Sequence, residues 1–418
     1  MHSGAPKLTI DIEGKDWLTV KIKAGRMELP AIEVDFSDQR IGEYYNILYD
    51  ALDKFLEIIG DEKQISISDA NRALKYLNSA GAGLMFYLFG NRISEVRDFM
   101  RRAVETWRMS STDAYTVPFV EVRSLQNKYI PVEFLPVFDS AAPAAATNSN
   151  DLLLIASRFL GFSTCINRIY HRPSLRSQVK TDAKIAQDAK MRVRFFKNRK
   201  LTRLQEEEDF LRNHAGIELL SKWPVGIAAP DQFINELAAL IWNGKDIATG
   251  VAEPQDDIHH FTCHCINDYA LSSNSKLHLT YPHKGLIWTS NKDVYVSIDS
   301  LAKEFGQQKS RDTKTSYPLV FLNACKSNKR NPLGLMSFPD LFVKHGNKGV
   351  IGTETMIPEM FAGEFSRCFY DKLVNGFSIS QALHTSRWYL LKRFNNPLGI
   401  LYTLYADPDL RMENHSHA

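Results

Sequence analysis

YPLVFLNAC, residues 317–325, is an apolar run that ends in a cysteine and is followed at once by polar residues. A short apolar run of this kind is typical of a strand buried in a parallel sheet. The rest of the chain continues in the same manner, with expected strands over 349–353 and 400–412 and expected helices over 359–376 and 378–394. This alternation predicts an α/β fold in which helices cover both faces of a mostly parallel central sheet.

A second expected strand, DDIHHFTCH (256–264), also ends in a reactive residue, His264. If the two strands are parallel neighbours, His264 and Cys325 emerge at the same sheet edge, where functional groups collect in such folds. A thiol reacts chiefly as the thiolate, and a nearby imidazole can take its proton. The alternatives are an inert core cysteine, which is the commoner role of a free cysteine, and a structural histidine.

A metal site is a competing interpretation of HHFTCHC (259–265), because cysteine and histidine are the ligands that zinc prefers. On a strand, however, Cys263 and Cys265 point to one face and His264 to the other. No second ligand pair with the usual spacing lies nearby, so neither a metal nor another cofactor is expected. The glycines of GNKGVIGTE (346–354) do not have the dinucleotide-binding spacing.

Composition favours an ordinary globular protein of a reducing compartment. The chain has 418 residues, of which 44% are hydrophobic and 24% charged, and its five cysteines are an odd number. It has no apolar run of the roughly 18 residues that a membrane span needs, and its first residues do not resemble a signal peptide. We therefore expect a cytoplasmic protein without a membrane partner.

The formal net charge of +3 does not suggest a nucleic-acid binder. One local exception is the segment Arg172–Arg203, which has eleven Lys and Arg residues against two Asp. A solvated surface and an acidic partner both remain open for this segment.

Upstream, periodicity predicts an N-terminal region of strands and helices. The expected elements are strands over 7–12, 17–24, 117–124 and 129–138 and helices over 41–59 and 70–107. We expect residues 1–114 to form a strand-and-helix extension that belongs to or packs on a second domain, which takes residues 115–418.

The order of motifs along the chain resembles that of the CHAT family, caspase-like cysteine peptidases of clan CD that are widespread in bacteria. The family has strands that end in F-A-C-H-G-type and L-S-A-C-type motifs, a later glycine-flanked strand, an A-L-x-x-A-type helix and a final G-[DN]-P. The matching segments are FTCHC (261–265), LNACKS (322–327), GNKGVIG (346–352), ALHTS (382–386) and YADP (405–408), with PVEFL (131–135) and Asn198–Glu208 upstream.

The resemblance implies a caspase-like three-layer α/β/α sandwich and hydrolysis of peptide bonds through a thioester acyl-enzyme. By position, His264 is the general base and acid, Cys325 is the nucleophile, and the backbone N–H groups of Cys265 and Cys325 hold the oxyanion. The chain departs from the family at Cys265, where the family has glycine, and at Lys326, where it has an acidic residue. Asp268 and Lys326 are the candidate substrate-pocket residues.

The same resemblance suggests partners. Family members act in bacterial anti-phage defence by cleaving a partner protein such as a gasdermin-like pore former, so we expect a protein substrate and an activating partner or ligand. The alternative is a catalytically silent binding or regulatory protein on a caspase-like scaffold.

Overall fold

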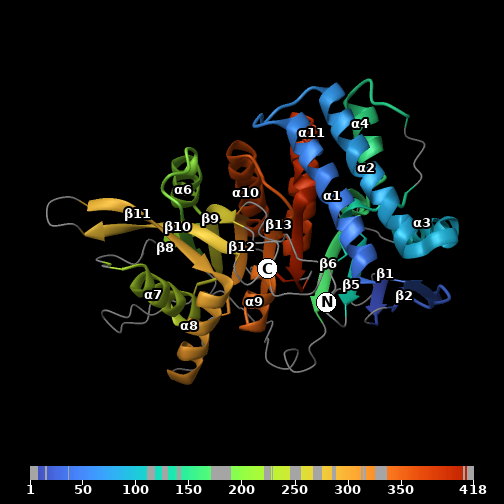
Figure 1. Cartoon of the computed structure of the whole chain (residues 1–418). Helices are drawn as coiled ribbons and strands as arrows, with labels where there is room; N and C mark the ends of the chain where they lie inside the picture. Colours follow the sequence, from blue (N-terminus) through green and yellow to red (C-terminus); the bar gives the residue numbers. More distant parts are fainter. Residues whose placement is uncertain are drawn as a thin grey trace. The chain divides into compact units, whose positions relative to one another are not determined.

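The structure is a computed structural model (Figure 1), whose described residues form two compact units. The described residues are 8–14, 17–35, 37–110, 118–124, 130–138, 143–170, 190–220, 227, 229–244, 256–266, 275–284, 289–311, 314, 317–324, 337–407 and 410–411. The first unit takes the described residues of Met1–Pro173 and Ser378–Leu410, and the second takes nearly all the others. The expected boundary between residues 114 and 115 lies inside the first unit and stays a prediction of where the peptidase domain begins.

The first unit contains a mixed sheet with the strand order β3-β2-β1-β5-β6, and β4 pairs with β2. β1, β5 and β6 are parallel, whereas β2 runs antiparallel to β1. Along β2, Leu18, Val20 and Ile22 are buried and the residues between them are partly exposed, as expected for a sheet with one covered face. The strands of this unit are β1 (Leu8–Glu13), β2 (Trp17–Ala24), β3 (Met27–Glu28), β4 (Ile32–Asp35), β5 (Phe119–Ser124), β6 (Cys165–Tyr170) and β14 (Tyr402–Ala406).

Helices α1 and α2 form a hairpin in the first unit (Figure 1). The single helix expected over 70–107 is two helices, because Gly90 takes a positive φ of 52° and a 3-10 turn separates α2 from α3. The helices of this unit are α1 (Asp38–Ile59), α2 (Ile67–Phe89), η1 (Gly90–Arg92), α3 (Ile93–Ser110), η2 (Val132–Phe134), α4 (Ser149–Ala156), α5 (Leu160–Ser163), α11 (Ile379–Phe394) and η4 (Pro397–Leu401).

The prediction of a strand over 129–138 is wrong. Within its described residues, Val132–Phe134 form the 3-10 turn η2, and strand-like pairing is limited to an isolated bridge between Pro136 and Phe159. The carboxylate of the turn, Glu133, is fully buried and pairs with the guanidinium of Arg168 on β6, which also donates to the carbonyl of Ile130 at 3.1 Å. On the other side, α2 approaches η2 so closely that a Cβ at Gly81 would lie 1.9 Å from the carbonyl oxygen of Phe134. The turn is therefore specified by a buried ion pair and a glycine contact.

The second unit contains a mostly parallel sheet in which β8, β7, β9, β12 and β13 run parallel in that order. β10 pairs antiparallel with the carboxyl end of β9, and β11 pairs antiparallel with β10. These strands are β7 (Met191–Lys197), β8 (Ile217–Leu220), β9 (Ile258–Ile266), β10 (Lys276–Lys284), β11 (Thr289–Ser297), β12 (Leu319–Ala324) and β13 (Gly349–Thr353).

Helices cover both faces of this second sheet (Figure 1). α6 contacts α10 on one face, and α7 contacts α8, which also contacts α9, on the other. The helices are α6 (Leu204–Asn213), α7 (Pro230–Asn243), α8 (Ile298–Arg311), α9 (Phe338–Lys344) and α10 (Glu359–Val374). The predicted fold class, α/β with a mostly parallel sheet between helical layers, is confirmed, together with an N-terminal sheet.

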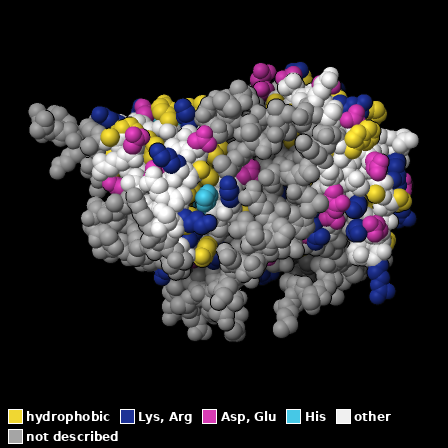
Figure 2. Space-filling model, turned by 60° about the horizontal axis from the view of Figure 1, so that its bottom comes forward, with side chains coloured by type: hydrophobic (Ala, Val, Ile, Leu, Met, Phe, Trp, Pro, Cys, Tyr) yellow, Lys and Arg dark blue, Asp and Glu magenta, His cyan; other side chains and the backbone are white. Residues whose placement is uncertain are grey.

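The described part of the basic segment, residues 190–203, finds acidic partners within the second unit. Lys197 pairs with Glu208, and Lys200 lies 2.5 Å from Asp293. On the face that Figure 2 shows, Lys and Arg side chains are interspersed with Asp and Glu side chains. These contacts favour a structural role for the described basic residues over a nucleic-acid surface. Among the described helices, none is long and apolar enough to cross a membrane.

Candidate active site

The carboxyl ends of β9 and β12 form the centre of the candidate site. The two strands are parallel neighbours, in a register that runs from Leu319 opposite Ile258 to Ala324 opposite Cys263. Ala324 is the last described residue of β12, and the residue after Cys263 on β9 is His264. The predicted pairing of these two strands, on which the proposed catalytic pair depends, is confirmed.

The side chains at the end of β9 alternate between the two faces, as predicted. His264 is exposed, whereas Cys263 and Cys265 are 2% and 8% exposed. The two thiols therefore face the interior, away from the imidazole, and do not converge with it on one metal ion. Within the described ranges, no group of three or more His, Cys, Asp and Glu side chains suits a metal.

Three predicted site residues lie outside the described residues, namely Cys325, Lys326 and Asp268. The segments that contain them, residues 267–274 and 325–336, also lie outside the described residues. Their roles stay predictions that follow from the register of the strands and from the resemblance.

A second histidine lies beside His264, and sequence reasoning did not single it out. His278 on β10 is opposite His264 in the strand register, and the two ring centroids are 6.0 Å apart. Its Nε2 lies 2.8 Å from Oδ1 of Asp293 on β11. Hydrogen bonds from Lys200 and His278 lower the pKa of Asp293, so a carboxylate is maintained beside the imidazole of His278.

Asn198, directly after β7, connects the ends of β9 and β10. Its backbone N–H donates to the carbonyl of Thr262 at 2.9 Å, and its Nδ2 donates to the carbonyl of His278 at 3.1 Å. The side chain is fully buried. Because Thr262 lies two residues before His264, this asparagine fixes the backbone on which both histidines are carried.

The buried carboxylate of Glu207 on α6 connects the carboxyl ends of β9 and β12. Its Oε1 accepts a hydrogen bond from Nδ2 of Asn323 at 2.9 Å, and its Oε2 accepts one from Oγ1 of Thr262 at 2.8 Å. Thr262 and Asn323 are opposite each other in the register. Each lies two residues before one of the proposed catalytic residues, so Glu207 holds together the strand ends that carry them.

Two further buried side chains extend this network. Nε2 of His260 lies 2.8 Å from Oγ1 of Thr262, and Nδ1 lies 2.8 Å from the hydroxyl of Tyr370. Because the Thr262 hydroxyl gives its single proton to Glu207, it accepts from Nε2–H of His260. Burial alone would raise the pKa of Glu207, but the charge of His260 and hydrogen bonds from His260, Ser366 and Thr262 hold this pKa below its ordinary value.

Replacing Glu207 with alanine is expected to lower the free energy of unfolding by about 3 kcal/mol, because buried donors on Asn323 and Thr262 lose their acceptor. Denaturant unfolding measures this loss. The matched control is Glu206→Ala, which removes an exposed neighbour that pairs with Arg203 at the start of the same helix and should change stability by less than about 0.5 kcal/mol. Equal effects of the two variants would show that Glu207 does not hold the strands.

The sequence carries a weak signal for Glu207. Leu204, Glu207 and Leu211 are the buried residues of α6 and follow the spacing of one helix face. An acidic residue at such a position indicates a buried polar partner, but three consecutive glutamates obscure which of them faces inward. The partners lie on other strands, so the sequence alone could not identify them.

A small cavity of about 40 Å³ lies next to His264, Asn323 and Glu207. Apolar side chains supply much of its wall, and Glu359 accepts hydrogen bonds from the hydroxyl of Thr202 and the backbone N–H of Arg203, at 2.8 and 2.9 Å. The cavity has room for about one water molecule. It is lined by Leu201, Arg203, Leu204, Glu207, Thr262, Cys263, His264, Asn323, Ile357, Glu359, Ala362 and Gly363.

Comparison with known proteins gives a family for the region that contains these strands. Residues 235–397 match the CHAT domain family model. Two crystal structures of the Saccharomyces cerevisiae separase–securin complex are similar to the chain, each with a TM-score of 0.46 and 11% sequence identity over 96% of this chain. The chain spans 30% of the length of the separase-complex chain that it matches. No curated protein sequence matches the chain. The matched region, residues 235–397, contains both β9 and β12 and is therefore similar to a CHAT domain.

Proposed function

We propose that the protein is a cysteine endopeptidase in which Cys325 is the nucleophile and His264 the general base and acid. The observation that carries this proposal is the parallel register of β9 and β12, in which Ala324 is opposite Cys263. One residue further along each strand are Cys325 and His264. A CHAT domain that includes both strands gives independent support.

The proposed reaction is acyl transfer in two steps. His264 takes the thiol proton of Cys325, and the thiolate attacks the carbonyl carbon of the scissile peptide bond. His264 then gives the proton to the leaving amine, and a thioester remains on Cys325. Water, activated by the same imidazole, hydrolyses the thioester and releases the acid and the free thiol.

Backbone N–H groups of Cys325 and Cys265 are the proposed oxyanion donors in both steps. The Cβ of Cys265, where the family has glycine, leaves this donor in place. The ammonium group of Lys326, directly after the nucleophile, favours the thiolate electrostatically. Asp268, if it lines the pocket for the residue before the scissile bond, selects Arg or Lys there.

The proposed substrate is a protein, and a gasdermin-like pore former in anti-phage defence is the candidate that the family resemblance supplies. The test is co-expression of this chain with the protein encoded next to it, followed by mass spectrometry of new termini. We expect cleavage by the wild-type chain and a loss of about 10²- to 10⁴-fold in His264→Ala, because a general acid–base is removed.

The control for this experiment is His278→Ala, which removes the neighbouring imidazole and leaves the proposed base in place. This variant is expected to retain most of the cleavage. Equal losses in the two variants would contradict the assignment of His264. Stable binding of the co-expressed protein, with no cleavage by any variant, would identify the chain as the silent regulatory scaffold instead.

A further inference from the structure

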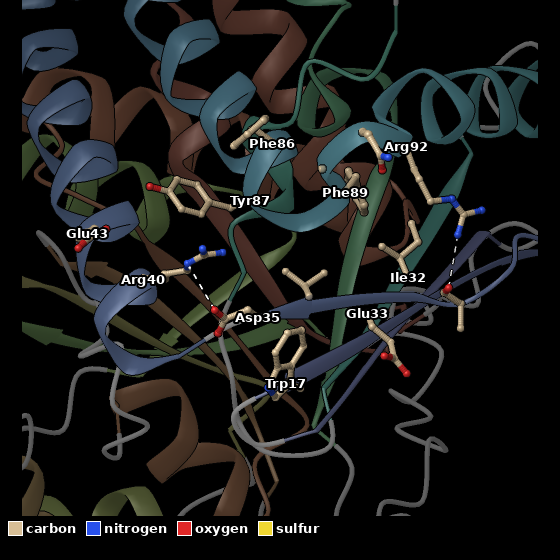
Figure 3. A pocket seen from close by; sticks show the side chains of 14 residues that line it. Trp17, Ile32, Glu33, Asp35, Arg40, Glu43, Phe86, Tyr87, Phe89 and Arg92 are labelled. Atoms are coloured by element: carbon tan, nitrogen blue, oxygen red, sulfur yellow. Dashed lines mark hydrogen bonds and ion pairs between the residues drawn. The ribbon is translucent and has the colours of Figure 1, made fainter.

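An open groove runs along the edge of the N-terminal sheet in the first unit (Figure 3). Its volume is about 790 Å³, far larger than the cavity beside His264. Figure 3 shows Trp17 and Glu33 on one side of β4 and Phe86, Tyr87 and Phe89 on the other. The groove is lined by Trp17, Ala31, Ile32, Glu33, Val34, Asp35, Arg40, Glu43, Phe86, Tyr87, Phe89, Gly90, Asn91 and Arg92.

The floor of this groove is an edge strand. Within the described residues, β4 pairs with β2 alone. Alternate residues of such a strand direct their N–H and C=O groups away from the sheet, and these groups can pair with an added strand. Nη1 of Arg92 donates to the carbonyl of Pro30 at 3.0 Å, just before β4 begins. The same nitrogen also donates to the carbonyl of Ala31 at 3.4 Å, so both carbonyls that precede β4 are already bound.

Two large aromatic side chains stand exposed at the walls. Trp17 is 63% exposed and Phe86 is 67% exposed, the largest values among the exposed large hydrophobic side chains of the described chain. They come from opposite sides of β4, one from β2 and one from α2. Exposed aromatic residues beside a hollow are typical anchors of protein–protein interfaces.

The groove has a net negative charge, because its two arginines are already paired with carboxylates while two further glutamates are not paired with a cation in the described part of the chain. Arg40 lies 3.5 Å from Asp35, and Arg92 is bound by Glu95 through two hydrogen bonds of 2.9 Å. Glu33 and Glu43 remain without a cationic partner among the described residues. The groove therefore complements a segment that carries positive charge.

We propose that this groove docks an extended, basic segment of a partner protein, which pairs as an added strand with β4. Side chains of an added strand alternate between the two sides of the sheet. On one side, basic side chains meet Glu33 next to Trp17. On the other, apolar side chains pack against Phe86. This is strand addition at a sheet edge, with backbone pairing for affinity and side-chain pockets for selectivity.

The test is selection of random dodecamer peptides, displayed on phage, against the full-length chain. We expect enriched peptides with Lys or Arg alternating with apolar residues. Synthetic copies should bind the Trp17→Ala/Phe86→Ala variant at least about thirtyfold more weakly, because interface anchors are removed. Glu33→Lys should weaken the same peptides about tenfold by charge reversal.

The control is Tyr76→Ala, which removes an exposed aromatic side chain of α2 outside the groove and should leave binding unchanged. Circular dichroism melting verifies that every variant is folded. The proposal would be overturned if no selected peptide bound more weakly to the Trp17→Ala/Phe86→Ala variant, or if the enriched peptides were acidic. Self-association of the chain that is lost in the same double variant would assign the groove to a second copy instead.

Discussion

Replacing Cys325 with alanine is expected to abolish peptide hydrolysis, with a loss in kcat of about 10⁴-fold or more. The loss is this large because the thioester requires the sulfur, and without it no covalent step takes place. The initial rate on a peptide that spans the cleavage site found by co-expression measures this effect.

The matched control for this substitution is Cys263→Ala. Cys263 directly precedes His264, yet its side chain is buried and lies on the opposite face of the strand. Its removal is expected to lower stability by the loss of packing while hydrolysis by the folded fraction continues. Hydrolysis that persists in Cys325→Ala and disappears in folded Cys263→Ala would show that the nucleophile is wrongly assigned.

Replacing Arg194 with methionine is expected to lower the free energy of unfolding by about 3–5 kcal/mol. The guanidinium is fully buried and holds Asp256 through two hydrogen bonds of 2.6 and 2.9 Å, next to His259 at 2.8 Å. Removing one partner leaves a buried carboxylate without its main counter-charge. Denaturant unfolding at neutral pH measures the loss, and Arg192→Met, at a partly exposed position on the same strand, should cost less than about 1 kcal/mol.

The double variant Arg194→Met/Asp256→Leu should recover much of the lost stability, because it removes both charges of the buried pair. The pH dependence of the stability of the wild-type chain, which the double variant should lack, is a second readout. Burial would raise the pKa of Asp256, but hydrogen bonds from His259 and Arg194 hold it below its ordinary value. The resulting stabilisation is present above a pH of about 3.9 and is lost as the pH falls through the lower pKa of the folded state. A double variant no more stable than Arg194→Met would contradict this account.

The parallel core of the second unit could be predicted from the sequence. β12 and β13 are nearly continuous apolar runs, and such runs indicate strands that are covered on both faces. The alternation of exposed His264 with buried Cys263 and Cys265 follows from the period of two in a strand. The ends of these strands, and therefore the position of the candidate site, could be predicted from the sequence.

Other elements depend on contacts that the sequence does not show. The hairpin of β10 and β11 escaped prediction, and with it the placement of His278 beside His264. The segment around Glu133 has the composition of a strand, but its buried pair with Arg168 and its contact with Gly81 stabilise a 3-10 turn. In both cases tertiary contacts decide the structure, and local propensity does not.

The most direct test of the catalytic pair is the pH dependence of Cys325 alkylation by iodoacetamide, followed residue by residue by peptide mapping. The other four cysteines are buried, so Cys325 should react first. In the wild-type chain the alkylation rate should report a thiol pKa below about 7.5, as for cysteines paired with histidine. In His264→Ala the profile should move toward the ordinary thiol value of about 8.5. Identical profiles for the two proteins would contradict the proposal that His264 and Cys325 act together.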